Sequence, residues 1–140
     1  MANTIDMQDI RNLNLFSKIT HVNTRFSFNY NNTIYFCVPK ESLKKALGKN
    51  AENVKKISRI MGKRVKIIPS PENKEPEEIK KFINKIISPV TAKEIKVSED
   101  EIIIDAGRES KAALIGRNKR RLNEMEQIVA NYFGKGFKII

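Results

Sequence analysis

The stretch Leu47-Gly48-Lys49-Asn50-Ala51-Glu52-Asn53-Val54 decides the fold, because it recurs further along as Ile115-Gly116-Arg117-Asn118-Lys119-Arg120-Arg121-Leu122. When Gly48 is aligned with Gly116, each glycine is followed by a basic residue and an asparagine. The alignment extends upstream, where Ile34-Tyr35-Phe36 falls on Ile102-Ile103-Ile104. A repeat of this kind indicates one supersecondary unit that is used twice. The sequence therefore predicts two small units within its 140 residues.

Hydrophobic periodicity predicts the same order of elements in both copies. In the first copy we expect a helix over 5–19, strands over 22–29 and 34–38, helices over 40–47 and 51–61, and a strand over 63–68. In the second copy we expect a helix over 76–87, strands over 92–98 and 101–106, helices over 108–115 and 119–133, and a strand over 136–140. Each unit then has the order α-β-β-α-α-β, which defines an α+β fold.

The strand pairing is predicted by matching apolar faces, because a slip of one residue turns every side chain to the other face. In the first copy this rule pairs Phe28 with Ile34 and Phe26 with Phe36. It leaves an odd-numbered loop around Tyr30-Asn31-Asn32 instead of a two-residue turn. In the second copy the rule pairs Val97 with Ile102 and Ile95 with Ile104.

A proline-rich stretch separates the two copies. Pro69-Ser70-Pro71-Glu72-Asn73-Lys74-Glu75-Pro76 contains three prolines, which resist helix and sheet alike. We expect a first domain over 1–69, a short and fairly stiff linker over 70–75, and a second domain over 76–140.

The net charge of +11 predicts a polyanionic partner. Residues 1–69 hold 13 lysines and arginines against 4 aspartates and glutamates, whereas residues 70–140 hold 14 against 12. The first half is therefore the stronger electrostatic attractor. The single cysteine, Cys37, cannot form an internal disulfide, and no Cys/His cluster predicts a metal site. The sequence has no apolar stretch of 18 residues and no signal-peptide layout at its start, so we expect no membrane association and a cytoplasmic location.

Both Gly-led loops have the chemistry of an anion site. A helix N-terminus has unpaired N–H groups and a partial positive charge, and glycine allows a close backbone approach. Lys49 and Arg117 add a mobile charge next to each glycine. The alternative is that each glycine only ends a helix. Neither loop matches a P-loop, and no G-x-G-x-x-G is present, so the sequence predicts no nucleotide cofactor.

The element order, with this loop between the middle helices, resembles a type II KH domain, and two in tandem resemble the archaeal-type NusA transcription factors. The first loop is similar to that family's Ile-Gly-Lys-x-Gly-x-Asn-Val pattern, and the resemblance covers nearly the whole chain. It implies that each loop clamps the backbone of single-stranded RNA. It also implies a non-enzymatic elongation, termination or antitermination factor that acts with RNA polymerase. The RNA-binding residues that it implies are Lys45, Gly48, Lys49, Asn50, Ala51 and Lys55 in the first copy, and Gly116, Arg117, Asn118, Lys119 and Arg120 in the second.

Both copies depart from the family pattern at its second glycine. We expect Ala51 to be a mild change, because alanine can open a helix without strain. We expect Lys119 either to crowd the sugar-phosphate path or to add a contact. Tyr30, Tyr35 and Tyr132 are interpreted as core residues in preference to base-stacking ones.

Three other functions remain open at this point. A ribosome-associated or RNA-maturation KH protein would use the same module. A nucleic-acid-processing enzyme would need clustered acidic metal ligands, for which Asp100, Glu101 and Asp105 have no matching set. A scaffold whose loops have lost RNA binding would contact protein only.

Overall fold

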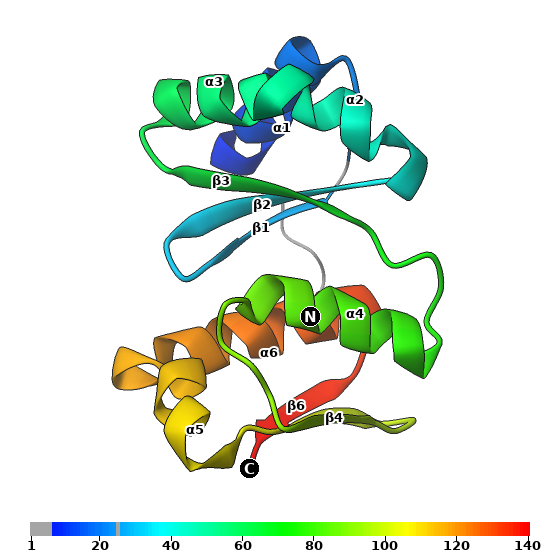
Figure 1. Ribbon diagram of the computed structural model, residues 1–140, viewed down its shortest axis with the longest axis vertical. Helices are drawn as coiled ribbons and strands as arrows, with labels where there is room; N and C mark the ends of the chain where they lie inside the picture. Colours follow the sequence, from blue (N-terminus) through cyan, green and yellow to red (C-terminus); the bar gives the residue numbers. More distant parts are fainter. Residues whose placement is uncertain (1–6, 25) are drawn as a thin grey trace. The chain divides into compact units, whose positions relative to one another are not determined.

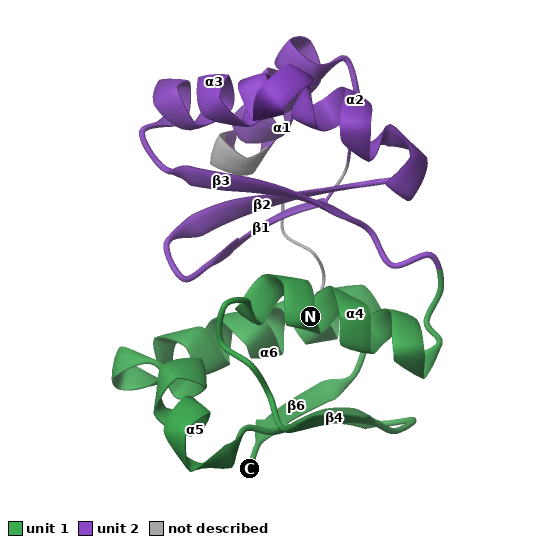
Figure 2. Cartoon of the chain, viewed as in Figure 1, with its two compact units in different colours: residues 1–3, 73–140 green, residues 4–72 purple. Residues whose placement is uncertain are grey.

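The computed structural model describes residues 7–24 and 26–140, with the side chains of Gln8 and Asp9 also outside the description. The described residues fall into two compact units, and the division in the sequence lies between Glu72 and Asn73 (Figure 2). We call the part before this division the N-terminal unit and the part after it the C-terminal unit.

The N-terminal unit has the predicted order of elements (Figure 1). It consists of α1 (Met7–Thr20), β1 (Phe26–Tyr30), β2 (Thr33–Val38), α2 (Leu43–Leu47), α3 (Glu52–Met61) and β3 (Arg64–Pro69), with single 3-10 turns at Lys40–Ser42 and Lys49–Ala51. The first helix was predicted from residue 5, and residues 5 and 6 lie outside the described part. The first strand is shorter than predicted and begins four residues later, at Phe26. Gly62 ends α3 in the left-handed conformation that glycine adopts readily.

The C-terminal unit repeats this order. It consists of α4 (Pro76–Ile87), β4 (Glu94–Val97), β5 (Glu101–Asp105), α5 (Gly107–Ile115), α6 (Arg120–Phe133) and β6 (Gly136–Ile139), with a 3-10 turn at Arg117–Lys119. Pro76 occupies the first turn of α4, where its missing N–H costs nothing, and Glu77 and Glu78 follow at the positive end of the helix dipole. The expected α-β-β-α-α-β order is thus confirmed in both units.

Each unit has its own three-stranded mixed sheet. The orders are β1-β2-β3 and β4-β5-β6, and no sheet within residues 7–24 and 26–140 spans both units. The first pair of each sheet is antiparallel and the second pair is parallel. Parallel neighbours require a crossover connection, and here α2 with α3, or α5 with α6, provides it. The Gly-led loop is therefore the bend in the middle of each crossover.

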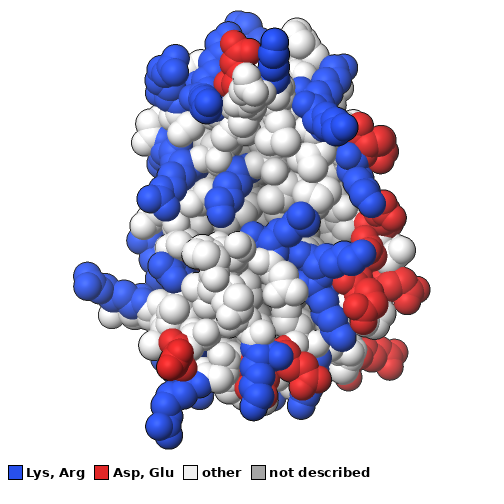
Figure 3. Space-filling view, viewed as in Figure 1, with Lys and Arg blue, Asp and Glu red and all other residues white. Residues whose placement is uncertain are grey.

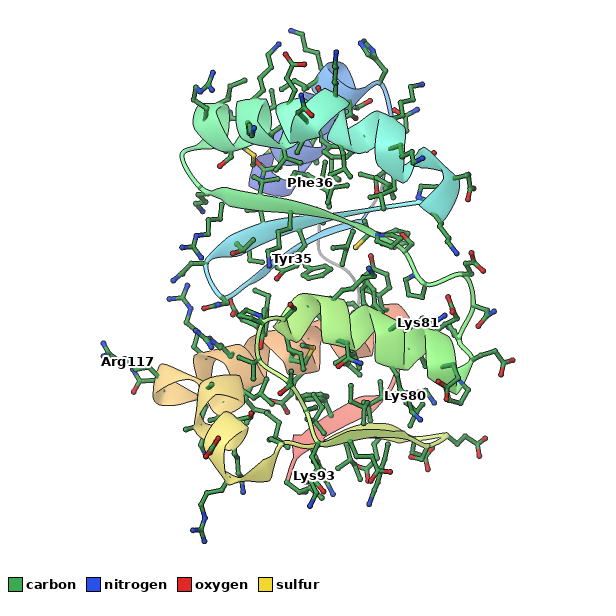
Figure 4. All side chains as sticks on the ribbon, viewed as in Figure 1. Tyr35, Phe36, Lys80, Lys81, Lys93 and Arg117 are labelled. Carbon is green, nitrogen blue, oxygen red and sulfur yellow. The ribbon has the colours of Figure 1, made fainter. Side chains whose placement is uncertain are left out.

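The core of the N-terminal unit lies between the sheet and its helices. Phe16 of α1 stacks on Phe36 of β2 with ring centroids 4.4 Å apart, and both side chains are fully buried. Figure 4 shows Phe36 pointing toward the helices and its neighbour Tyr35 pointing to the other face of the sheet. The other buried members of this core are Val22, Ile34, Val38, Ala46, Ile57, Val65 and Ile67.

The predicted register of the first hairpin was wrong by one residue. Phe28 pairs with Tyr35 and Phe26 with Cys37, around a two-residue turn at Asn31 and Asn32. Both asparagines have positive φ angles, 52° and 57°, as a two-residue hairpin turn of this type requires. The aromatic rings of Phe28 and Tyr35 stack at 5.0 Å, on the face opposite Phe36. All six residues of β2 are buried, so both of its faces are apolar and face matching could not select the register.

The predicted register of the second hairpin is confirmed. Val97 pairs with Ile102, and Ile95 pairs with Ile104. In this strand pair the buried side chains do alternate, with Ile102 and Ile104 fully buried between half-buried neighbours. The core of this unit also contains Ile79, Phe82, Ile83, Ile86, Leu114, Met125, Ile128, Val129, Phe133 and Phe137.

Candidate nucleic-acid interface

The loop of the N-terminal unit joins α2 to α3 through a run of unusual backbone conformations. Gly48 has φ 76° and ψ 174°, Asn50 has φ 54° and ψ 33°, and Ala51 has φ 57° and ψ 32°. The N–H of Gly48 donates to the carbonyl of Lys44 at 3.1 Å, which ends α2. The N–H of Ala51 then donates to the carbonyl of Gly48 at 3.2 Å, and α3 begins at the next residue.

The loop of the C-terminal unit has the same backbone. Gly116 has φ 77° and ψ 171°, Asn118 has φ 55° and ψ 29°, and Lys119 has φ 59° and ψ 24°. The N–H of Lys119 donates to the carbonyl of Gly116 at 3.2 Å, as at the equivalent place in the first loop. Two different sequences thus adopt one conformation, which shows that the loops are equivalent in structure as well as in sequence.

The expectation that Ala51 opens its helix without strain was wrong. Ala51 and Lys119 both lie in the left-handed region, which costs a residue other than glycine about 1–2 kcal/mol. Asn50 and Asn118 also have positive φ, but asparagine tolerates this region better than most residues. The second glycine of the family pattern is therefore replaced at a position where the backbone favours glycine.

Basic side chains surround the first loop. Lys49 and Asn50, with Glu52 and Lys55 of α3, line an open hollow of about 250 Å³. Lys45 of α2 is exposed, as are Lys49 and Lys55. Among the described residues none of these three lysines forms an ion pair. Three exposed lysines beside a helix N-terminus, with Glu52 as the one acidic residue in the hollow, make the loop attractive to a phosphate group.

The second loop presents its basic side chains in the same place. Arg117, Lys119 and Arg120 are exposed, and Figure 4 shows Arg117 extending away from the loop. The guanidinium of Arg120 lies 3.9 Å from the carboxylate of Glu124 and is partly compensated by it. Within the described part of the chain, Arg117 and Lys119 have no acidic partner.

The structure gives a role to two residues to which the sequence analysis assigned none. The side-chain amide of Asn53, on the first turn of α3, donates to the carbonyls of Ala46 at 3.1 Å and Lys45 at 3.4 Å. The guanidinium of Arg121, on the first turn of α6, donates to the carbonyl of Ala113 at 2.9 Å. The alignment of Gly48 with Gly116 also aligns Asn53 with Arg121, and the shared ability to donate a hydrogen bond was the signal in the sequence.

The aromatic residues that could have stacked bases are core residues in the N-terminal unit. Tyr30 and Tyr35 are buried, and burial raises the pKa of the Tyr35 phenol above its ordinary value. Tyr132 is half-buried and its ring lies 4.9 Å from that of Phe82. Cys37 is buried. No group of three or more His, Cys, Asp or Glu residues in the described ranges is arranged to hold a metal ion.

Charge is distributed unevenly over the molecule. Figure 3 shows lysine and arginine side chains spread over the helices of the N-terminal unit, with few acidic side chains among them in this view. Exposed basic residues of that unit include Lys44, Lys56, Arg59, Lys63, Arg64 and Lys66 in addition to those at the loop. A search for membrane-spanning helices in the described residues finds none of sufficient length and hydropathy.

The fold and the loops define a class of protein: an α+β chain of two similar units, each with a three-stranded mixed sheet and a Gly-led basic loop within its crossover. The chain is a distant homologue of archaeal NusA. It is 26% identical over 141 residues to the probable transcription termination protein NusA of Methanococcus vannielii, with 97% of this chain and 79% of that protein covered.

A solved structure supports the fold. The crystal structure of APE1850 matches with a TM-score of 0.65 and 18% identity, over 97% of this chain and 99% of that chain. At this level of identity the match shows the fold alone. No family model matches the chain.

Proposed function

We propose that the protein consists of two tandem type II KH domains that bind single-stranded RNA. The domains correspond to residues 1–69 and 76–140, with a linker over 70–75. The observation that supports this proposal best is the closely matching backbone of the two loops, each with exposed basic side chains and each opening a helix. A Gly-led loop of this kind approaches the sugar-phosphate backbone, and the bases enter the adjoining groove.

The RNA-binding residues that we propose form two groups. Lys45, Gly48, Lys49, Asn50, Ala51 and Lys55 belong to the first domain, and Gly116, Arg117, Asn118, Lys119 and Arg120 belong to the second. The lysines and arginines contribute mobile positive charge to the phosphates. The glycines and asparagines set the path of the backbone.

We further propose that the protein acts in transcription elongation, termination or antitermination together with RNA polymerase, as a non-enzymatic cytoplasmic factor. The homology to a probable NusA of an archaeon supports this proposal. In-cell crosslinking scored for both RNA and protein partners tests it. Recovery of polymerase subunits with nascent RNA supports the proposal, whereas recovery of ribosomal subunits would favour the ribosome-associated or RNA-maturation function.

The second test addresses enzymatic activity. We expect no cleavage of RNA or DNA when the purified protein is incubated with magnesium. Cleavage that persists through purification and is lost on unfolding would overturn the non-enzymatic role.

A further inference from the structure

We infer that Asn53 and Arg121 are positioning residues, which hold the two loops in the conformation that meets the RNA backbone. The inference rests on the proposed RNA binding and adds residues outside the basic set. Both side chains start on the helix after the loop and end on the helix before it. Each therefore forms a bridge across the bend of the crossover.

The two bridges reach the same place by different chemistry. The alignment of the copies places Ala113 on Lys45, so Asn53 and Arg121 contact equivalent turns of α2 and α5. The last carbonyls of a helix have no intrahelical N–H partner and need another donor. A short amide in one copy and a long guanidinium in the other satisfy the same requirement. This agreement indicates that the bridge itself is retained, and not one particular side chain.

The glycine of each loop makes room for the bridge. A Cβ on Gly48 would lie 2.9 Å from Nδ2 of Asn53, and a Cβ on Gly116 would lie 2.9 Å from Cγ of Arg121. Real Cβ atoms essentially never approach other atoms so closely, so any larger residue would push the bridging side chain away. The glycine thus serves the bridge as well as the approach of a ligand.

The loops need such a restraint, because two successive residues in each have positive φ without being glycine. Residues in this region persist only where the surrounding structure holds them there. The bridge fixes the two helix ends between which Asn50 and Ala51 lie, and Arg121 does so for Asn118 and Lys119. A loop that is ordered before binding loses less freedom when RNA arrives, so its affinity is higher.

A matched pair of variants separates the bridge from the charge of Arg121. Arg121→Asn and Arg121→Leu both remove one positive charge, but only asparagine can donate to the carbonyl, as Asn53 does in the other copy. We expect Arg121→Asn to bind a single-stranded oligoribonucleotide about fivefold more tightly than Arg121→Leu does, which is the gap expected for one hydrogen bond. Equal affinities of the two variants would overturn the positioning role.

The first copy supplies a second pair. Asn53→Leu keeps the size of the side chain and removes the donor. The control is Ser58→Ala, which removes the 2.6 Å hydrogen bond from the Ser58 hydroxyl to the carbonyl of Lys63 at the far end of the same helix. We expect Asn53→Leu to weaken RNA binding about fivefold and Ser58→Ala to leave it unchanged. A loss of affinity in both variants would attribute the effect to stability and would contradict the inference.

A readout without RNA distinguishes this inference from the proposed function. We expect NMR order parameters of the backbone amides at 49–51 to fall from about 0.85 to below about 0.6 in Asn53→Leu, with those of Ser58→Ala unchanged. Rigid loops in Asn53→Leu would refute the positioning role even where RNA binds. Failure of the parent protein to bind any single-stranded RNA would refute the proposed function and leave the loop measurement to decide the bridge.

Discussion

Replacing Ala51 by glycine should stabilise the N-terminal unit, although glycine usually destabilises a helical region. Ala51 has φ 57° and ψ 32°, where a residue with a Cβ loses about 1–2 kcal/mol. Glycine removes that cost, but it also gives the unfolded chain more conformational freedom, which lowers the free energy of unfolding by about 0.4–1 kcal/mol. We therefore expect a net gain of about 0.5–1 kcal/mol, which corresponds to a rise of roughly 2–8 °C in the melting temperature of a domain of this size.

The same substitution elsewhere in the chain provides the control. Ala130 is exposed within α6, where glycine should cost about 0.5–1 kcal/mol. The chain has no tryptophan whose fluorescence could report unfolding. Unfolding is therefore best followed by amide NMR signals, with those of β2 reporting on the N-terminal unit and those of β5 on the C-terminal unit. Opposite signs for Ala51→Gly and Ala130→Gly support the left-handed conformation at residue 51. A loss of stability in both variants would show that Ala51 does not have the backbone described above.

Three further results are expected. Lys49→Asp with Asn50→Asp should weaken RNA binding more than Arg117→Asp with Asn118→Asp, because residues 1–69 carry the larger positive balance. Both variants should melt within a few degrees of the parent. The reverse order of affinities would show that local loop charge outweighs the charge of the unit. A plot of log affinity against log salt concentration should fall with a slope of up to about 4 if all six basic side chains proposed at the two loops contact phosphates. Single-stranded RNA should bind more tightly than duplex DNA at equal salt. A salt-independent affinity would argue against phosphate contacts. In an ultraviolet pH titration the Tyr35 phenol should ionise at a higher pH than an ordinary tyrosine, because burial raises its pKa. The stability linked to this group should be present below about pH 10 and lost as the pH rises through the pKa of the folded state. Tyr35→Phe should remove this high-pH step.

The order of elements could be predicted from sequence because each copy constrained the other. Pro76 and the apolar positions of α4 predicted a helix over 76–87, and the structure has the same bounds. The second hairpin was predicted correctly because only one face of β5 is fully apolar. The first hairpin was not, because Tyr35 and Cys37 are as deeply buried as Ile34 and Phe36. When both faces of a strand are buried, side-chain alternation no longer carries the register, and the Asn31-Asn32 turn was the better guide.

The loop could be located from sequence, but its backbone could not. Alanine and lysine are good helix formers, so Ala51 and Lys119 were read as ordinary helix starts. In the structure both are forced into the left-handed region by the bend between two helices, which overrides local preference. Asn53 and Arg121 were missed for a related reason. A polar residue on the first turn of a helix is usually solvated, and only the folded crossover places its donor beside a carbonyl of the preceding helix.

The two copies show which feature of the loop is constrained. Their backbone angles agree to within about 10°, although one has alanine and the other has lysine at the position where the family pattern has glycine. A conformation that costs free energy in both copies, and is kept by both, is not the product of local preference. It is maintained by the hydrogen bonds across the bend, which Asn53 forms in one copy and Arg121 in the other. The side chain at the second-glycine position is then free to vary, and Lys119 adds an exposed positive charge to the second loop.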